Sequence, residues 1–339
     1  MKAGSTAPRP QLRETMLIVS QKDLAQLASP REIISVVEAA LRAQFAGRVR
    51  TPKRLHMDRE GGTFLTMPAL GEELVGVKLI SVIPANATHG LPVTKGIMIL
   101  SDSKVGVPVA LMDAAALTAQ RTGAVGALGV KYMSPQDTSS LGIVGCGVQG
   151  AWQVIFACAV RPIREVFACS RSASSFERFS ETVRSHVPHV RLTVCATVRE
   201  LLERTGTVIT ATPSSFPVLP DEPRLLERRH FISIGSFRPT MQELPDSVYR
   251  LAGLLAVDSE HAVDEVGDVI NPLKKGLLKE GDVFSIGECV TNKRVIDTGR
   301  TTVYKSVGSA MYDLFVAEAL YRAAKLRGMG TEVVSLEHH

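Results

Sequence analysis

Three glycines in the stretch SSLGIVGCGVQGAWQ constrain the fold more than any other feature of the chain. Gly145, Gly147 and Gly150 have the spacing G-x-G-x-x-G, directly after the apolar run 141–144. Such glycines let a strand turn tightly into a helix whose N-terminus faces a dinucleotide pyrophosphate. We therefore predict that the cofactor-binding loop comprises Gly145, Gly147, Val148, Gln149 and Gly150.

The segments after residue 140 alternate between strand-like and helix-like patterns. Apolar runs typical of strands lie at 141–145, 165–169, 191–195, 207–211, 231–235 and 253–257. This alternation predicts an α/β fold with a doubly wound, parallel Rossmann sheet. One of these strands ends in VITATPS, so we expect Thr210, Ala211 and Thr212 to lie along the cofactor.

The end of the second strand of this section indicates which dinucleotide binds. An NAD site usually places an acidic residue there, where it bonds the ribose 2′-hydroxyl. This chain has Ser170, Arg171 and Ser172 after Cys169, and no acid. Arg171 can pair with a 2′-phosphate, which a carboxylate would repel, and Ser170 can donate a hydrogen bond to it. We expect NADP(H) to be preferred, with NAD(H) as the alternative.

The residues before the glycine loop follow a different pattern. Strand-like runs at 63–67, 75–82, 96–100 and 107–111 succeed one another, and a helix of small residues is expected over 113–132. An earlier helix begins with a capping box at Ser29, and the last helix is expected over 302–326. The front section is therefore predicted to be an α+β domain.

Three cations lie in this front section. Lys78 interrupts the apolar strand VGVKLISV, Arg121 lies in the small-residue helix ALTAQRTGAVGAL, and Arg54 belongs to the segment TPKRLHM. Buried unpaired cations are costly, so each needs an anion or a dipole nearby. Structural ion pairing and the binding of an anionic ligand would both meet this need.

Composition and charge exclude several classes of partner. The net charge is +5 and aromatic residues make up 5%, so nothing indicates a nucleic-acid surface. No apolar run approaches the roughly 20 residues of a membrane span. The five cysteines are scattered without a C-x-x-C motif, which predicts free thiols, no metal site and a cytoplasmic location.

Other polar residues are expected to be solvent-exposed or to have structural roles. Asp258, Asp264 and Glu265 in VDSEHAVDEVGD are expected to form a solvated acidic loop. His56 and His89 lie near the cations in sequence, but lone histidines are more often packed or exposed than catalytic.

The chain resembles the ornithine cyclodeaminase/mu-crystallin family from about Met16 to Leu326. The likeness rests on the segments GVKLISVIPAN, GLPVTKGIMILSD, GVPVALMDAAALTAQRTGAVGAL and VYKSVGSAMYDL, and on the glycine loop. The resemblance implies a discontinuous substrate-binding and dimerisation domain, residues 1–120 completed by 302–330. It also implies a Rossmann domain at 121–301 and a homodimer formed through the front sheet.

The resemblance also implies roles for individual residues. The family's carboxylate-binding arginines correspond to Arg54 and Arg121, its active-site lysine to Lys78, and a contact beside the nicotinamide to Val307. These roles are chemically coherent, because a guanidinium can bind the carboxylate of an α-imino acid through two hydrogen bonds. A lysine between two arginines should also have a lowered pKa, which suits acid–base chemistry.

Two departures from the family pattern bear on the reaction. Phe237 stands where ornithine cyclodeaminases carry an aspartate, and Val93, followed by Thr94, stands where they carry a threonine. Arg238-Pro239 is similar to a turn of the ketimine reductases. The resemblance therefore implies NADPH-dependent reduction of Δ1-pyrroline-2-carboxylate or Δ1-piperideine-2-carboxylate to proline or pipecolate. The alternatives are an ornithine cyclodeaminase, an alanine-type amino-acid dehydrogenase and a non-enzymatic ligand-binding protein.

Overall fold

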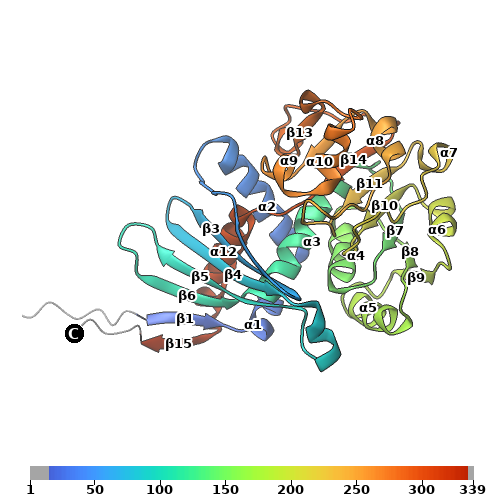
Figure 1. The fold of residues 1–339 in the computed structure, drawn as a ribbon. Coiled ribbons are helices and arrows are strands. Elements are labelled where there is room, and N and C mark those ends of the chain that lie inside the picture. Colours follow the sequence, from blue (N-terminus) through green and yellow to red (C-terminus); the bar gives the residue numbers. More distant parts are fainter. Residues whose placement is uncertain (1–14, 335–339) are drawn as a thin grey trace, which may run out of the picture.

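The computed structural model describes residues 15–334, which form two sheets with helices between and around them (Figure 1). The first sheet has seven strands in the order β15-β1-β6-β5-β4-β3-β2, and all neighbours except β1 and β6 are antiparallel. Its strands are β1 (Thr15–Val19), β2 (Leu55–Arg59), β3 (Gly62–Leu70), β4 (Leu74–Val82), β5 (Thr94–Asp102), β6 (Pro108–Asp113) and β15 (Thr331–Val334).

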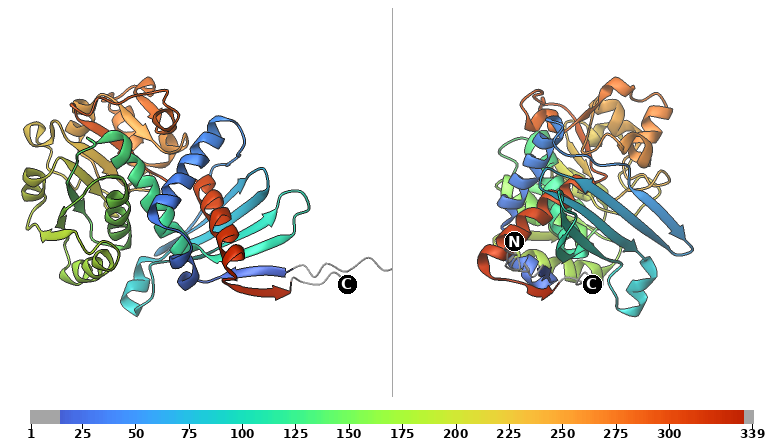
Figure 2. Two further views of the ribbon diagram at one scale, coloured as in Figure 1. Left: turned by 180° about the vertical axis from the view of Figure 1, so that it is seen from behind. Right: turned by 90° about the vertical axis from the view of Figure 1, so that its left-hand side faces the viewer.

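One face of the seven-stranded sheet is covered by helices and the other is open. The covering helices are α1 (Gln21–Leu27), α2 (Pro30–Phe45), α3 (Ala114–Met133) and α12 (Ala310–Arg327), and the 3-10 helix η1 (Pro84–His89) joins β4 to β5. The capping box predicted at Ser29 begins α2. Figure 2 shows no helix over the opposite face among residues 15–334, and Leu79 and Ile97 on that face are 44% and 39% exposed.

The second sheet has eight parallel strands in the order β13-β12-β14-β11-β10-β7-β8-β9. Its strands are β7 (Ser140–Val144), β8 (Glu165–Cys169), β9 (Arg191–Val194), β10 (Thr207–Thr210), β11 (His230–Ser233), β12 (Leu255–Val257), β13 (Val283–Ser285) and β14 (Thr302–Lys305). The predicted α/β class with a doubly wound parallel sheet is confirmed. The sequence patterns missed β13 and β14. Strand β13 is the edge strand next to β12, and β14 lies between β12 and β11.

Helices cover both faces of the parallel sheet. The helices of this half are α4 (Val148–Val160), α5 (Ala173–His186), α6 (Val198–Arg204), α7 (Pro223–Leu226), α8 (Asp246–Ala252), α9 (Ala262–Glu265), α10 (Gly267–Lys274), α11 (Gly287–Val290) and the 3-10 helix η2 (Glu280–Asp282). Helices α4 and α5 lie with α3 on one face, and α6, α7 and α8 lie on the other. Two apolar cores result, and the larger one fills the space between the two sheets.

Helix α3 connects the two halves of the molecule. It packs on strands β4, β5 and β6 of the first sheet and on β11 and β14 of the second. The predicted domain boundary at residue 120 falls inside this helix. Residues 302–305 pair within the parallel sheet, whereas 310–334 return to the seven-stranded sheet. The division into two domains remains a prediction, and residues 1–14 lie outside the described part of the chain.

The single helix predicted over 302–326 is wrong in its first eight residues. Residues 302–305 form β14, which pairs with β11 and β12, and α12 begins only at Ala310. The β-branched and aromatic residues Thr302, Val303 and Tyr304 suit a buried strand between two others. Gly308 then adopts a φ of +75°, which interrupts a right-handed helix, and Ser309 caps α12.

Within the described residues, none of the helices has the length and apolar character needed to span a membrane.

Candidate active site

The glycine loop forms a cradle at the carboxyl end of β7. Gly145 has a φ of +105°, and a Cβ there would lie 2.6 Å from the carbonyl oxygen of Ala211. A Cβ on Gly150 would overlap the carbonyl oxygen of Gly145, whereas one on Gly147 would meet nothing within 4 Å. The first and third glycines therefore permit close backbone packing, and the second leaves open space for a ligand to approach.

The N-terminus of α4 fits an anionic group. Gly147 is its N-cap, and no described side chain caps the free backbone N–H groups of the first turn. Val148 is 71% exposed on this turn, and Gln149 Oε1 is buried with no hydrogen-bond partner among the described residues. Uncapped N–H groups and the helix dipole favour a phosphate at this position, so the loop fits a dinucleotide.

The residues after β8 lie next to the glycine loop, since Gly145 N donates to the carbonyl oxygen of Cys169 at 3.0 Å, and they include a guanidinium with no ion-pair partner among the described residues. Ser172 caps α5, accepting a hydrogen bond from Ser175 N at 3.3 Å, and Ser170 is half-buried beside it. Arg171 is exposed and forms no ion pair with any residue of the described chain. Its charge is therefore available to a ligand.

The loops after β10 and β11 are joined by a glutamate that sequence reasoning missed. Glu243 is fully buried, and its Oε1 accepts from Thr212 N at 2.7 Å and from Thr212 Oγ1 at 2.8 Å. Its Oε2 accepts from Gly235 N at 2.7 Å and from Ser233 Oγ at 3.0 Å. The expected cofactor residue Thr212 is thus held by Glu243, while the buried hydroxyl of Thr210 has no partner among the described residues.

A second buried carboxylate and a buried lysine complete this polar cluster. Asp268 accepts from Tyr249 Oη at 2.8 Å and from Ser236 Oγ, and burial raises the pKa of Tyr249 well above its usual value. Lys305, the last residue of β14, donates to Ser233 Oγ at 3.1 Å. Burial lowers the pKa of the Lys305 ammonium, and Asp268 opposes this effect.

Two of the three predicted substrate-site cations meet at one carboxylate. Lys78 Nζ lies 2.8 Å from Asp313 Oδ1 and 2.7 Å from Oδ2, and Arg121 Nε donates to Oδ1 at 2.9 Å. Lys78 extends from β4, Arg121 from α3 and Asp313 from the first turn of α12. Thr118 Oγ1 lies 3.4 Å from Lys78 Nζ. All three charged side chains are buried.

The third cation, Arg54, lies against the turn before α12. Its Nη2 is 2.5 Å from Glu265 Oε2, 2.9 Å from the carbonyl oxygen of Val307 and 3.1 Å from that of Gly308. The predicted cofactor residue Val307 is therefore also a partner of Arg54. The guanidinium of Arg121 also lies against this turn, because a Cβ on Gly308 would overlap its Nη1. The fold thus brings the two arginines together.

The expectation of a solvated acidic loop at 257–268 is wrong for Asp258 and Glu265. Asp258 is fully buried and accepts from Ser306 Oγ, Val307 N and Gly308 N, each at 2.8 Å. Glu265 is 5% exposed and pairs with Arg54, whereas Asp264 is exposed as expected. The buried acids face N–H groups and a cation from distant parts of the chain, which compensates their burial.

The electrostatics of the cluster favour acid–base chemistry at Lys78. Burial, followed by the charge of Arg121, lowers the pKa of Lys78 to about 7, while Asp313 opposes the shift. The predicted lowering of this pKa is confirmed, although burial outweighs the arginines as its cause. With Lys78 protonated, the three cations and the carboxylates of Glu265 and Asp313 leave one positive charge, which matches a ligand with one carboxylate.

Residues of β2 and of the loop after β11 are less buried than the cation cluster. His56 is half-buried, and its burial together with Arg54 lowers its pKa. Arg238 lies over the ring of Phe237, at 5.6 Å from its centroid, and donates to Asp58 Oδ1 at 3.0 Å. This contact joins the loop after β11 to β2. His89 is exposed on η1 and is not part of the cluster.

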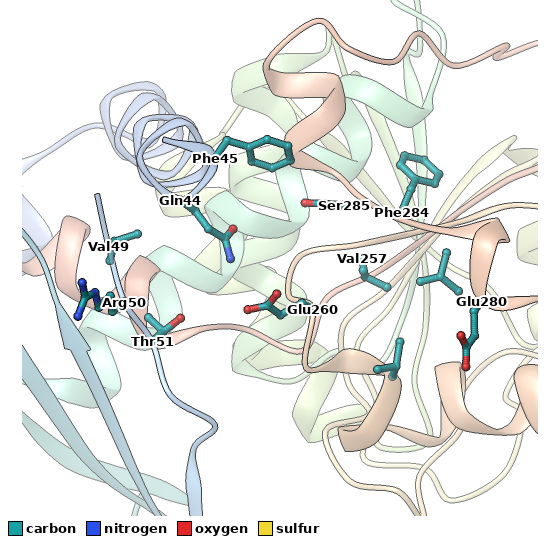
Figure 3. Close-up of a pocket in the computed structure, with 12 residues that line it drawn as sticks. Gln44, Phe45, Val49, Arg50, Thr51, Val257, Glu260, Glu280, Phe284 and Ser285 are labelled. Carbon is teal, nitrogen blue, oxygen red and sulfur yellow. The ribbon is translucent and has the colours of Figure 1, made fainter. Parts of the chain in front are cut away.

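A hollow of about 600 Å³ lies between the end of α2 with the residues after it and strands β12 and β13. Figure 3 shows Gln44, Phe45 and Thr51 on one side of it and Phe284 and Glu280 on the other. Its lining includes none of the three cations. Thr51 of this lining also has its carbonyl oxygen 3.4 Å from His261 Nε2. His261, Arg54 and Glu265 line a second, much smaller cavity of about 10 Å³.

The sequence patterns did not indicate that Asp313, Glu243 or Asp258 is buried, and of these three Asp313 alone carried a weak signal. Asp313 is the only charged residue in the segment SAMYDLFVA, a pattern typical of a buried ion pair. Glu243 and Asp258 had no comparable signal, because each lies in a loop where acidic residues are usually exposed.

Comparisons with known proteins agree with this arrangement. The model of the ornithine cyclodeaminase/mu-crystallin family matches residues 14–327. The Delta(1)-pyrroline-2-carboxylate reductase of Bacillus cereus is 33% identical over 331 residues, covering 94% of this chain and 99% of that protein.

Two solved enzyme structures have the same fold along nearly the whole chain. The Thermococcus litoralis Delta(1)-pyrroline-2-carboxylate reductase, in complex with NADH and L-proline, has a TM-score of 0.88 and 32% identity, covering 94% of this chain and all 100% of that one. An archaeal alanine dehydrogenase dimer with bound NAD has a TM-score of 0.86 and 28% identity, covering 94% and 99%.

Proposed function

The chain belongs to the ornithine cyclodeaminase/mu-crystallin family, and on this premise we propose that it is an NADPH-dependent reductase of cyclic α-imino acids. Its substrate is Δ1-pyrroline-2-carboxylate or the six-membered Δ1-piperideine-2-carboxylate, and its product is proline or pipecolate. The observation that carries this proposal is that Lys78 and Arg121 share the carboxylate of Asp313, while Arg121 and Arg54 both lie against the 306–308 turn.

The chemistry needs one hydride for the imine carbon and one proton for the imine nitrogen. A bound NADPH supplies the hydride. Arg54 and Arg121 bind the substrate carboxylate, since a guanidinium and a carboxylate form paired, charge-assisted hydrogen bonds. Lys78 donates the proton, because a lysine whose pKa is about 7 can give up a proton at neutral pH. Orientation by these three residues accounts for much of the expected rate enhancement.

The relatives support imine reduction over the alternatives. Two of them are named pyrroline-2-carboxylate reductases, and one of these was solved with NADH and L-proline. The alanine dehydrogenase supports the second candidate, reductive amination of a 2-oxo acid such as pyruvate. Phe237 argues against ornithine cyclisation, because it offers no carboxylate to a distal amine.

The preference for NADPH over NADH is part of the proposal. It is supported by the free guanidinium of Arg171 and by the hydroxyls of Ser170 and Ser172 after β8. The solved relatives hold NADH or NAD in their structures, so this chain would differ from them in its cofactor.

We also propose that the protein works as a homodimer in the cytoplasm. The open face of the seven-stranded sheet exposes Leu79 and Ile97, and a second copy of the same face would bury them. The alanine dehydrogenase relative is a dimer. The five cysteines are free, as is usual for thiols in a reducing compartment.

A substrate panel tests the proposed function. NADPH oxidation is followed with Δ1-pyrroline-2-carboxylate, Δ1-piperideine-2-carboxylate and pyruvate plus ammonia, and proline formation is followed with ornithine. We expect kcat/KM to be at least tenfold higher for a cyclic imine than for the other substrates. Efficient use of pyruvate plus ammonia would support the second candidate, and efficient ornithine cyclisation would overturn the proposal.

A further inference from the structure

One carboxylate serves two of the cations that the proposed reaction uses. Asp313 lies within 2.9 Å of both Lys78 Nζ and Arg121 Nε, and no part of its side chain is exposed. These three residues come from α12, β4 and α3, so the contact forms only when the helices pack on the sheet. A buried carboxylate between two cations restricts the position of each of them.

We infer two properties of this arrangement. Asp313 is a positioning residue that fixes Lys78 and Arg121 in one geometry. A substrate carboxylate bound at Arg121 causes Lys78 to take up the proton that it later donates. This inference rests on the proposed function for the role of Lys78.

The geometry of Arg121 supports the first part of the inference. Its Nε is engaged by Asp313, which leaves the two terminal nitrogens for other partners. These nitrogens lie against Gly308, where a Cβ would overlap Nη1, and Arg54 binds the carbonyl oxygen of the same residue. Because arginine binds a carboxylate through two N–H groups, Asp313 presents the correct edge of the guanidinium to the substrate.

The charges around Lys78 support the second part. Arg121 from α3 and Arg54 from the segment before β2 disfavour the charged form of the lysine, and Asp313 from α12 favours it. Glu265 from α9 pairs with Arg54, and His56 of β2 lies nearby. A substrate carboxylate offsets the charge of the arginines, so the ammonium form of Lys78 becomes more favourable. At pH 8, where most of the free enzyme holds Lys78 uncharged, the acid would then be loaded mainly when a substrate is present.

Calorimetry on the wild-type holoenzyme tests this coupling without turnover. Pyrrole-2-carboxylate has a planar ring and an α-carboxylate, but no reducible imine and no group that titrates near neutral pH. It is titrated into the protein with NADPH at pH 8, in two buffers of different ionisation enthalpy. We expect net proton uptake that approaches one proton per site, is lost in Lys78→Met and persists in His56→Gln. Binding without uptake by the wild type would overturn the coupling.

A substitution at Asp313 tests the positioning role. In Asp313→Asn we expect the alkaline limb of the kcat–pH profile to move by about one pH unit or more toward lower pH, because an attractive charge is lost. At a pH above the alkaline limbs of both enzymes this corresponds to a roughly tenfold lower kcat. Asp313→Glu should restore part of the shift. The control is Glu318→Gln, which removes a half-buried carboxylate of the same helix that pairs with Arg322 and not with Lys78, and which should leave the profile unchanged.

The outcomes separate this inference from the proposed function. An unchanged alkaline limb in a folded Asp313→Asn variant would overturn the positioning role while imine reduction stands. A wild type that reduces no cyclic imine would overturn the proposed function. Even if the wild type reduces no cyclic imine, the calorimetry with the analogue still tests the coupling. This measurement uses the wild-type protein and does not depend on whether an Asp313 variant folds.

Discussion

Lys78 shows how a single buried side chain can acquire a function. An ammonium group loses its hydration on burial, so its charged form is retained at neutral pH only because Asp313 lies 2.7 Å away. Its neighbours across the sheet, Met67 on β3 and Met98 on β5, are apolar and buried. The residue therefore has one charged partner, and its protonation is sensitive to any charge added at the arginines.

The rate of imine reduction should depend on the protonation of Lys78. In the free enzyme its pKa is lowered to about 7, so the donor form is lost as the pH rises, and kcat/KM for the imine should fall above about pH 7. Lys78→Met should lower kcat/KM by roughly 10²–10⁴-fold, the usual scale for a positioned acid, and abolish this alkaline limb. Values of kcat/KM for the imine between pH 5.5 and about 9 check this. Exposed Lys22 provides the control, Lys22→Met, and a Lys78 variant of near wild-type rate would contradict the prediction.

Arg171 should decide the choice of dinucleotide. Arg171→Asp removes a charge-assisted contact with the 2′-phosphate worth about 1.5–3 kcal/mol, so kcat/KM for NADPH should fall by about 10- to 100-fold. The value for NADH should change little or rise. The control is Arg178→Asp, at an exposed arginine of α5, the helix that follows Arg171. Equal efficiency of the wild type with both cofactors would contradict the proposed preference.

At the scale of elements, buried acids connect loops that the sheet alone does not hold. Asp258, directly after β12, binds three groups of the 306–308 turn, and this turn contacts both arginines. Glu243 does the same for the loops after β10 and β11. Loops at the carboxyl ends of parallel strands carry the ligand contacts of such folds. Their positions here depend on these two carboxylates.

Glu243→Gln should loosen the loops after β10 and β11. An amide can keep one set of hydrogen bonds, but its NH₂ group cannot accept from the backbone N–H groups of the other loop. We expect a loss of about 1–3 kcal/mol in the free energy of unfolding and weaker binding of NADPH. Denaturant unfolding and fluorescence titration measure the two effects. The control Glu203→Gln changes an exposed glutamate of α6, and equal effects of the two substitutions would contradict the prediction.

At the scale of the whole molecule, the two sheets differ in how they are covered. The parallel sheet has helices on both faces, whereas the seven-stranded sheet has helices on one face only among residues 15–334. Leu79 and Ile97 are direct cross-strand neighbours on its open face. Contiguous apolar surface of this kind usually marks an interface, which is the physical basis for the proposed dimer.

Leu79→Asp should convert the dimer into a monomer. A charge at this position would have to be buried without a partner in an apolar interface, at a high cost in free energy. Sedimentation velocity at micromolar concentration measures the change. Val295→Asp, at a residue that is 92% exposed, should leave the assembly intact. A monomeric wild type would contradict the proposed assembly, while the fold and the site within one chain would stand.

The sequence by itself determined the features that depend on local patterns. The spacing of Gly145, Gly147 and Gly150 after an apolar run predicted the turn from β7 into α4, because only a residue without a Cβ fits at Gly145 and at Gly150, where the backbone packs closely. The alternation of apolar segments predicted the parallel sheet. Lys78 and Arg121 stood out because charges are rare in segments of small and apolar residues. The resemblance to the family and these two residues both indicated a site that contains Arg54, Lys78 and Arg121.

Only the tertiary structure decided which groups meet. Lys78 and Arg121 contact Asp313, which is 235 and 192 residues away, so no local pattern could reveal the partner. Segment 302–305 became a strand because β11 and β12 offer backbone hydrogen bonds on both sides. Asp258 is buried because the 306–308 turn supplies N–H groups to it. Burial and pairing are set by distant partners, and the packing of helices on the sheets brings those partners together.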